Sequence, residues 1–132
     1  MMGIVNERST EHPHMGMSTT QSGSITVLSV SGDVDLSSAP MLEEQALGLL
    51  TDNPSGLIVD LTDVNFLASM GMALLVDLSK RTAGSVEFAV VANGNATARP
   101  LELLGLGDVL AIHPELDDAL SALSGDPAAP PE

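Results

Sequence analysis

The chain contains no cysteine, tryptophan or tyrosine, and only two of its 132 residues are phenylalanine. The absence of cysteine excludes disulfide bonds, thiolate metal sites and cysteine nucleophiles. Because aromatic rings are nearly absent, the core must be built from Leu, Val, Ile, Ala and Met. Hydrophobic residues still make up 44% of the chain. That fraction and this length are typical of one globular domain with a single core.

Basic residues are also scarce, since four Lys and Arg stand against 18 Asp and Glu and give a formal net charge of −14. Nucleic acids and anionic membrane surfaces are bound through clustered positive charge. The composition therefore argues against both as partners. It leaves open either a protein partner with a basic face or an acidity that serves solubility alone.

Long apolar runs are missing as well. No run approaches the ~20 residues of a membrane-spanning helix, and the start of the chain lacks the apolar core of a signal peptide. We therefore expect no membrane insertion and a cytoplasmic location. Residues 1–16 and 124–132 are expected to be flexible tails around a domain at 17–123. For the H-x-H pair of His12 and His14 we favour exposed imidazoles over a metal site, and we expect no cofactor.

Strand and helix patterns alternate along the domain. Apolar and β-branched runs predict strands at 25–31, 57–61, 86–91 and 109–112, and residues 17–21 add a candidate edge strand. Helical periodicity predicts helices that begin at Ser37 or Ser38 as N-cap, at Met70, at Thr97 and at Pro114. The alternation predicts an α/β fold, with a mixed, mainly parallel sheet of four to five strands flanked by about four helices.

The most informative stretch joins the strand at 57–61 to the helix at 70–81, with Ser69 at the junction. A hydroxyl there lies near free N–H groups and the positive end of a helix dipole. Ser69 is therefore either an N-cap worth ~1 kcal/mol or a site of modification. Met70 and Met72 widen the apolar surface at the start of the helix. This end of the helix is either deeply buried or a docking shoulder for a partner.

Sequence motifs for catalysis are missing, because the chain has neither a glycine-rich nucleotide loop nor a G-x-S-x-G. Asp33 and Asp35 lie on one side of an extended strand end. They are either a pair that binds a metal or serves as acid and base, or simply a solvated strand end. Without a third ligand we favour the solvated strand end. His113 precedes Pro114 and is expected to fill a helix cap position rather than to serve Ser69 as a base. We do not expect an enzyme.

Several motifs, taken in order, resemble those of one protein family. They are G-D-V-D-L at 32–36, L-I-V-D-L at 57–61, F-L-A-S-M-G-M-A-L-L at 66–75 and L-E-L-L-G-L at 101–106. Over about residues 17–123 this pattern resembles the STAS domain of bacterial anti-sigma factor antagonists. The resemblance implies a mixed, mainly parallel sheet flanked by helices. It also implies a protein that binds an anti-sigma factor of the serine-kinase type, frees a sigma factor, and stops binding when one serine is phosphorylated.

Matched to the family motif, Ser69 falls on the phosphorylated serine, Gly71 on its glycine and Asp35 on a nearby acid. Ala68 stands where the family has an aspartate, and Met70 replaces a small residue. The resemblance thus implies phosphorylation at Ser69, and we place the partner-binding surface at Asp35, Ser69, Met70, Gly71 and Met72.

Other functional classes remain open. The same helix end in a STAS adaptor subunit would dock on a membrane transport complex without phosphorylation, and the missing aspartate slightly favours this alternative. A small hydrolase or nucleotide-binding protein is a third candidate, which the missing motifs disfavour.

Overall fold

The computed structural model describes residues 14–124, and the parts expected as tails at 1–13 and 125–132 lie outside the described residues. Its elements follow in the order β1 (Met15–Ser22), β2 (Ile25–Val34), α1 (Ala39–Leu50), β3 (Gly56–Leu67), α2 (Ser69–Thr82), β4 (Glu87–Val91), α3 (Ala98–Leu103), the 3-10 turn η2 (Leu106–Asp108), β5 (Ile112–His113) and α4 (Leu116–Ser124). The candidate edge strand is therefore present. It begins earlier than expected, because Met15 is 3% exposed and packs in the core rather than lying in a tail.

The five strands form one sheet in the order β1-β2-β3-β4-β5. Strand β1 pairs antiparallel with β2, and the remaining pairs are parallel. Helices connect the parallel strands, as parallel pairing requires. This arrangement confirms the predicted mixed, mainly parallel sheet with four helices.

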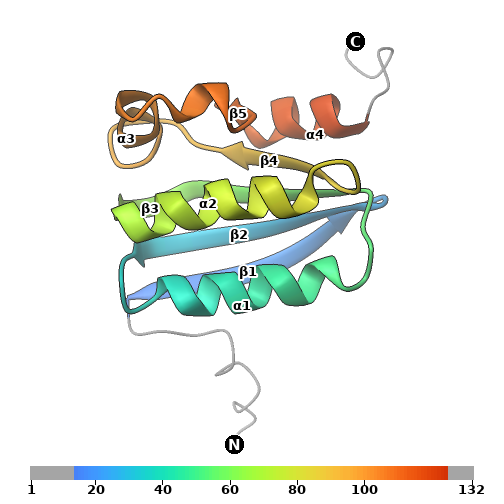
Figure 1. Cartoon of the computed structure of the whole chain (residues 1–132), viewed down its shortest axis with the longest axis horizontal. Coiled ribbons are helices and arrows are strands. Elements are labelled where there is room, and N and C mark those ends of the chain that lie inside the picture. The colour runs from blue at the N-terminus through green and yellow to red at the C-terminus, as the bar shows by residue number, and fades with distance from the viewer. Residues whose placement is uncertain (1–13, 125–132) are drawn as a thin grey trace, which may run out of the picture.

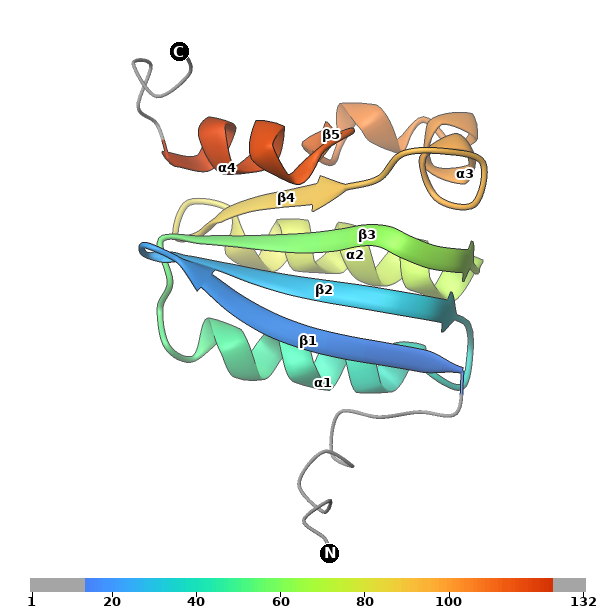
Figure 2. The same cartoon turned by 180° about the vertical axis from the view of Figure 1, so that it is seen from behind.

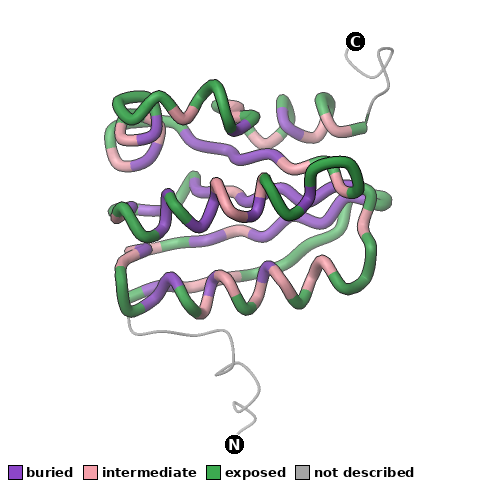
Figure 3. Tube along the Cα trace, viewed as in Figure 1, coloured by how far each residue is buried: buried purple, intermediate pink, exposed green. Residues whose placement is uncertain are grey.

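Helices α1 and α2 lie on one face of the sheet (Figure 1), and α4 packs on part of the other face, mainly against β4, and leaves β1 uncovered there (Figure 2). The larger core cluster lies under α1 and α2 and includes Leu42 and Leu75, both at most 1% exposed. The smaller cluster lies under α4 around Ala119 and Ile58. Buried residues concentrate in the central strands and on the inner faces of the helices (Figure 3). Leu, Val, Ile, Ala and Met make up both clusters of buried apolar residues, as the composition required.

Strand β3 is longer than the predicted strand at 57–61, because it continues to Leu67. Its second half pairs with the end of β2, with Val64 opposite Gly32 and Leu67 opposite Val34. Strand β2 is also longer than the predicted strand at 25–31, because it continues through Gly32 to Val34. The extension brings the ends of both strands to the start of α2.

The predicted strand at 109–112 is wrong in position and length. The N–H groups of Val109 and Leu110 bond back to the carbonyl of Leu106 in a local turn, so they do not join the sheet. Strand β5 contains only Ile112 and His113. The His113 carbonyl accepts from Ala92 N at 3.0 Å, so His113 is a strand residue rather than a helix cap.

Within residues 14–124, no helix combines the length and hydrophobicity needed to cross a membrane. The same part of the chain contains no group of three or more His, Asp or Glu side chains arranged to hold a metal ion. His12, one half of the H-x-H pair, lies outside the described residues.

Candidate functional site at the start of helix α2

Ser69 is the first residue of α2, at the carboxyl end of the sheet. It is exposed. The N-cap position is Ala68, whose extended backbone (φ −78°, ψ 167°) ends β3, and no side chain caps the helix. The interpretation of Ser69 as the N-cap is therefore wrong, because the helix begins one residue earlier than predicted. Among the described residues, the Ser69 hydroxyl has no hydrogen-bond partner.

The backbone at this junction is nevertheless firmly held. Ala68 N donates to Val34 O at 2.8 Å, and Ala68 O accepts from Gly71 N at 2.9 Å and from Met72 N at 3.1 Å. The first turn of α2 contains no acidic residue. Its N–H groups and the positive end of the helix dipole therefore face outward without a side-chain anion.

Gly71 allows α2 to approach the sheet closely. A Cβ atom added at this position would lie 2.7 Å from Val34 Cγ1 and 2.8 Å from Leu67 Cδ1. Val34 is fully buried and Leu67 nearly so, which leaves them little room to move. Gly71 is itself buried, so it positions Ser69 rather than forming exposed surface.

Asp35 organises the loop between β2 and α1. Its Oδ1 accepts hydrogen bonds from Ser37 N and Ser38 N at 3.0 Å and from both hydroxyls at 2.9 and 3.2 Å. These bonds, above all the one from the Ser38 backbone, hold the pKa of Asp35 below its usual value. Ser38 is the N-cap position of α1, but its hydroxyl donates to Asp33 O at 2.9 Å instead of capping the helix.

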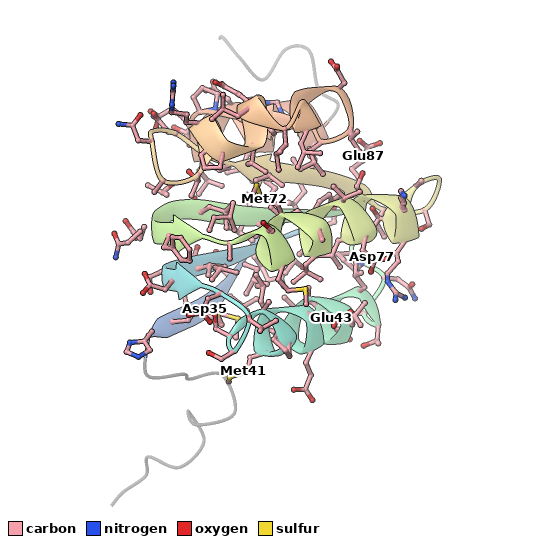
Figure 4. All side chains as sticks on the ribbon, turned by 60° about the vertical axis from the view of Figure 1, so that its left-hand side comes forward. Asp35, Met41, Glu43, Met72, Asp77 and Glu87 are labelled. Carbon is pink, nitrogen blue, oxygen red and sulfur yellow. The ribbon has the colours of Figure 1, made fainter. Side chains whose placement is uncertain are left out.

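Exposed apolar side chains lie at this end of the sheet, and Met70 is the one among them that was expected. Leu36 (70% exposed) follows β2, Phe66 (52%) lies at the end of β3, and Met70 (47%) lies in the first turn of α2. We call these three residues the apolar rim. Met72 is only 7% exposed and belongs to the core. It lies on the side of α2 away from α1 (Figure 4).

Sequence reasoning placed Met72 in the docking shoulder and missed Leu36 and Phe66. One signal for Leu36 was available, because it is the one apolar residue in the polar turn that follows Asp35. Phe66 carried no such signal, since an apolar residue next to Leu67 is equally consistent with a buried strand.

A groove of about 220 Å³ runs between α1 and α2 from the apolar rim. Met70 and Leu74 line it from α2, and Ala39 and Pro40 line it from α1. Glu43 and Asp77 are its charged residues, and both are acidic (Figure 4). The groove extends the surface beside Ser69 with an apolar floor and acidic sides, and Arg81 partly compensates their charge through its ion pair with Asp77 at 2.7 Å.

The arrangement at this end of the sheet suits protein docking better than catalysis. Among the residues described, no basic side chain is hydrogen-bonded to Ser69, and Asp35 Oδ1 accepts from the Ser37 and Ser38 N–H groups of the turn. Asp33 and Asp35 are used differently in the turn, because Asp33 accepts from the Ser38 hydroxyl through its backbone carbonyl and Asp35 accepts through its carboxylate.

Comparison with known proteins identifies the family. Residues 16–119 match the sequence profile of the STAS domain. The chain belongs to the STAS domain family. A relative from Mycobacterium tuberculosis, named anti-sigma-F factor antagonist RsfB, is 41% identical over 101 residues, which cover 76% of this chain and 83% of the relative.

Solved structures agree with this STAS assignment. The crystal structure of an anti-sigma factor antagonist from Mycobacterium paratuberculosis superposes with a TM-score of 0.82 and 36% identity, and the match covers 86% of this chain and 97% of that one. The unphosphorylated form of the anti-sigma factor antagonist SpoIIAA has the same fold, with a TM-score of 0.69 at 12% identity over 84% of this chain and 98% of that one.

Proposed function

We propose that this STAS protein is an anti-sigma factor antagonist that binds an anti-sigma factor of the serine-kinase type and thereby releases a sigma factor. Family membership and the names of the relatives support the regulatory class. One observation carries the assignment of the site: Ser69 is exposed at an uncapped helix start, beside the apolar rim. The proposed contact surface is Ser69 with the apolar rim, and Asp35 and Gly71 hold it in place.

Phosphorylation of Ser69 is proposed to turn this docking off. A phosphate adds roughly −1.5 to −2 charges at neutral pH. The first turn of α2 has no acidic side chain, so its N–H groups and dipole can accept that charge without a side-chain anion in the same turn. The fold therefore tolerates the phosphate, while the charge makes the adjacent apolar rim costly to bury against a partner.

The direct test is calorimetric binding of Ser69→Asp to the cognate anti-sigma factor. We expect at least a tenfold loss of affinity, about 1.4 kcal/mol, with little change in melting temperature. Ser121→Asp is the matched control, because Ser121 is exposed on α4 and the substitution adds the same charge. Equal affinities for Ser69→Asp and Ser121→Asp would contradict the proposal.

Incubation with the anti-sigma factor and ATP tests the modification itself. Mass spectrometry is expected to place one phosphate on Ser69. The Ser69→Ala variant should carry no phosphate and should still bind the partner. Docking of the same surface on a transporter subunit, with no phosphate transfer from the anti-sigma factor, would instead favour the STAS adaptor of a membrane transport complex. The uncapped Ala68 position, where the family motif has an aspartate, is the observation that keeps this second function open.

A further inference from the structure

The outer edge of β1 is long and uncharged. β1 is the outermost strand of the sheet on its side, and its eight residues, M-G-M-S-T-T-Q-S, include no charged residue and no proline. The opposite edge, β5, is only two residues long. Sheet edges in monomeric proteins are usually shortened, charged or interrupted by proline to prevent pairing with another chain. β5 follows this rule and β1 does not.

The register shows which backbone groups of β1 face outward. Met15 lies opposite Gly32, and Asp33 N donates to His14 O at 2.7 Å. Because hydrogen-bonded pairs alternate along an antiparallel ladder, the even-numbered residues of β1 bond to β2. The odd-numbered residues therefore direct their N–H and C=O groups away from the sheet. Met15 is buried, so the accessible outward groups belong to Met17, Thr19 and Gln21.

Charge decides where a second copy of this chain can approach. Each copy has a formal net charge of −14, so two copies repel one another over most of their surfaces. Ser18 to Ser22 form an exposed stretch with neither acids nor bases. Because β1 has no acidic residue, contact along this edge does not bring carboxylates of the two β1 strands together. A strand is also self-complementary when it pairs antiparallel with its own copy across a two-fold axis.

We propose that two copies of this protein associate through antiparallel β1–β1 pairing, which joins their sheets into one. The outward groups fix the register, because Met17 then pairs with Gln21 of the second copy and Thr19 with the same residue of that copy. With the symmetry-related pair of Gln21 and Met17 there are three such pairs, and each exchanges two hydrogen bonds. The proposal does not depend on the proposed function, since β1 lies at the sheet margin (Figure 2), whereas Ser69 begins α2, which contacts α1 and β4.

Sedimentation velocity of the full chain over a wide concentration range tests whether the dimer exists. The mass is expected to rise from 13.5 kDa toward twice that value as concentration increases. Raising the salt from about 0.15 to 0.5 M should favour the dimer, because it shortens the Debye length from about 8 Å and screens the repulsion. A mass that stays at 13.5 kDa up to the solubility limit in both salts would overturn the proposal.

Disulfide trapping tests the contact, and the absence of native cysteine makes every introduced thiol unique. In the proposed register, Thr19→Cys places two cysteines opposite one another with Cα atoms about 5.5 Å apart, within disulfide range. Ser22→Cys is the matched control on the same strand, with its copies roughly 20 Å apart at 3.4 Å per residue. Mild oxidation should cross-link Thr19→Cys at least tenfold faster, and equal rates would exclude this edge as the interface.

A charge placed on the edge should break the dimer without unfolding the protein. Thr19→Lys puts two like charges at the axis and is expected to keep the mass at 13.5 kDa. Ser121→Lys makes the same charge change on α4, and it should leave dimerisation intact or strengthen it by lowering the net charge. Thermal melts confirm that both variants fold. Dimerisation of Thr19→Lys at the wild-type concentration would contradict the proposed contact.

Discussion

The two ends of helix α2 are built differently. At the C-terminal end, Thr82 Oγ1 donates to Leu78 O at 2.8 Å and to Ser79 O at 3.2 Å. Thr82 O in turn accepts from Ser85 N and Val86 N at 2.9 Å. Lys80 and Arg81 in the last turn complement the negative end of the dipole. Bonds from outside the helical ladder therefore reach the Ser79 and Thr82 carbonyls at this end, which favours stability.

The N-terminal end has none of these features. Ala68 supplies no cap, the first turn has no acid, and Ser69 is exposed beside the apolar rim. A helix start of this kind loses about 1 kcal/mol relative to a capped one. The contrast indicates that the C-terminal end stabilises the fold, whereas the N-terminal end stays exposed, as the proposed docking and phosphorylation would require. The predictions that follow test this contrast, from the largest expected effect to the smallest.

Gly71→Ala should destabilise the protein most, because it forces the uncapped end away from the sheet. The added methyl would lie 2.7 Å from Val34 Cγ1, and overpacking of this kind costs about 1–3 kcal/mol. That cost exceeds the ~0.5–1 kcal/mol gained by replacing a helical glycine. Gly48→Ala in α1 is the control, since nothing lies within 4 Å of its added Cβ. Urea denaturation should show opposite changes in the free energy of unfolding.

Ala68→Asp should stabilise the fold. The Ala68 backbone is already extended, as an N-cap requires, so an added carboxylate can accept from the free N–H groups of the first turn. The expected gain is about 1 kcal/mol in the free energy of unfolding, measured by thermal or urea denaturation. Ala68→Asn separates the hydrogen bond from the charge. If neither variant is more stable than the wild type, the missing N-cap side chain does not cost α2 any stability.

The sequence predicted most of the fold because the main strands and helices have regular periods. Strand β3 was predicted too short because its buried residues Leu61, Val64 and Leu67 are three apart rather than two. Register shifts between β2 and β3, at Ser29/Ser31 and at Gly32/Asp33, change which face each residue points to. Irregularities of this kind depend on the neighbouring strand, so a single-sequence period does not reveal them.

The candidate site was predicted in part for a similar reason. The strand-to-helix pattern placed Ser69 and Gly71 at the start of the helix, and the structure has both residues there. Met70 and Met72 have the same side chain and cannot be separated by composition. Their exposures of 47% and 7% differ because the 100° turn per residue of an α-helix directs one outward and the other into the core. That distinction requires the direction of the helix relative to the sheet.

Thr82→Val tests the stabilised end of α2. It removes the buried hydroxyl and its bonds to Leu78 O and Ser79 O, at an expected cost of about 0.5–1.5 kcal/mol in the free energy of unfolding. Thr51→Val is the control at the end of α1. There the hydroxyl also bonds a carbonyl, Gly48 O at 2.6 Å, but it is exposed, so water replaces the bond. A cost at Thr51 equal to that at Thr82 would show that burial does not set the difference.

Asp35→Asn should have the smallest effect, and it should depend on pH. Hydrogen bonds from Ser38 and Ser37 lower the pKa of Asp35 in the folded state, so the ionised form is favoured by folding. Its contribution is complete above the unfolded pKa of about 3.9 and is lost as the pH falls through the lowered value. Calorimetric melts should show Asp35→Asn a few degrees below wild type at pH 7 and a smaller difference in strong acid. A pH-independent difference for Asp35→Asn would mean that the turn does not depend on the charge of Asp35.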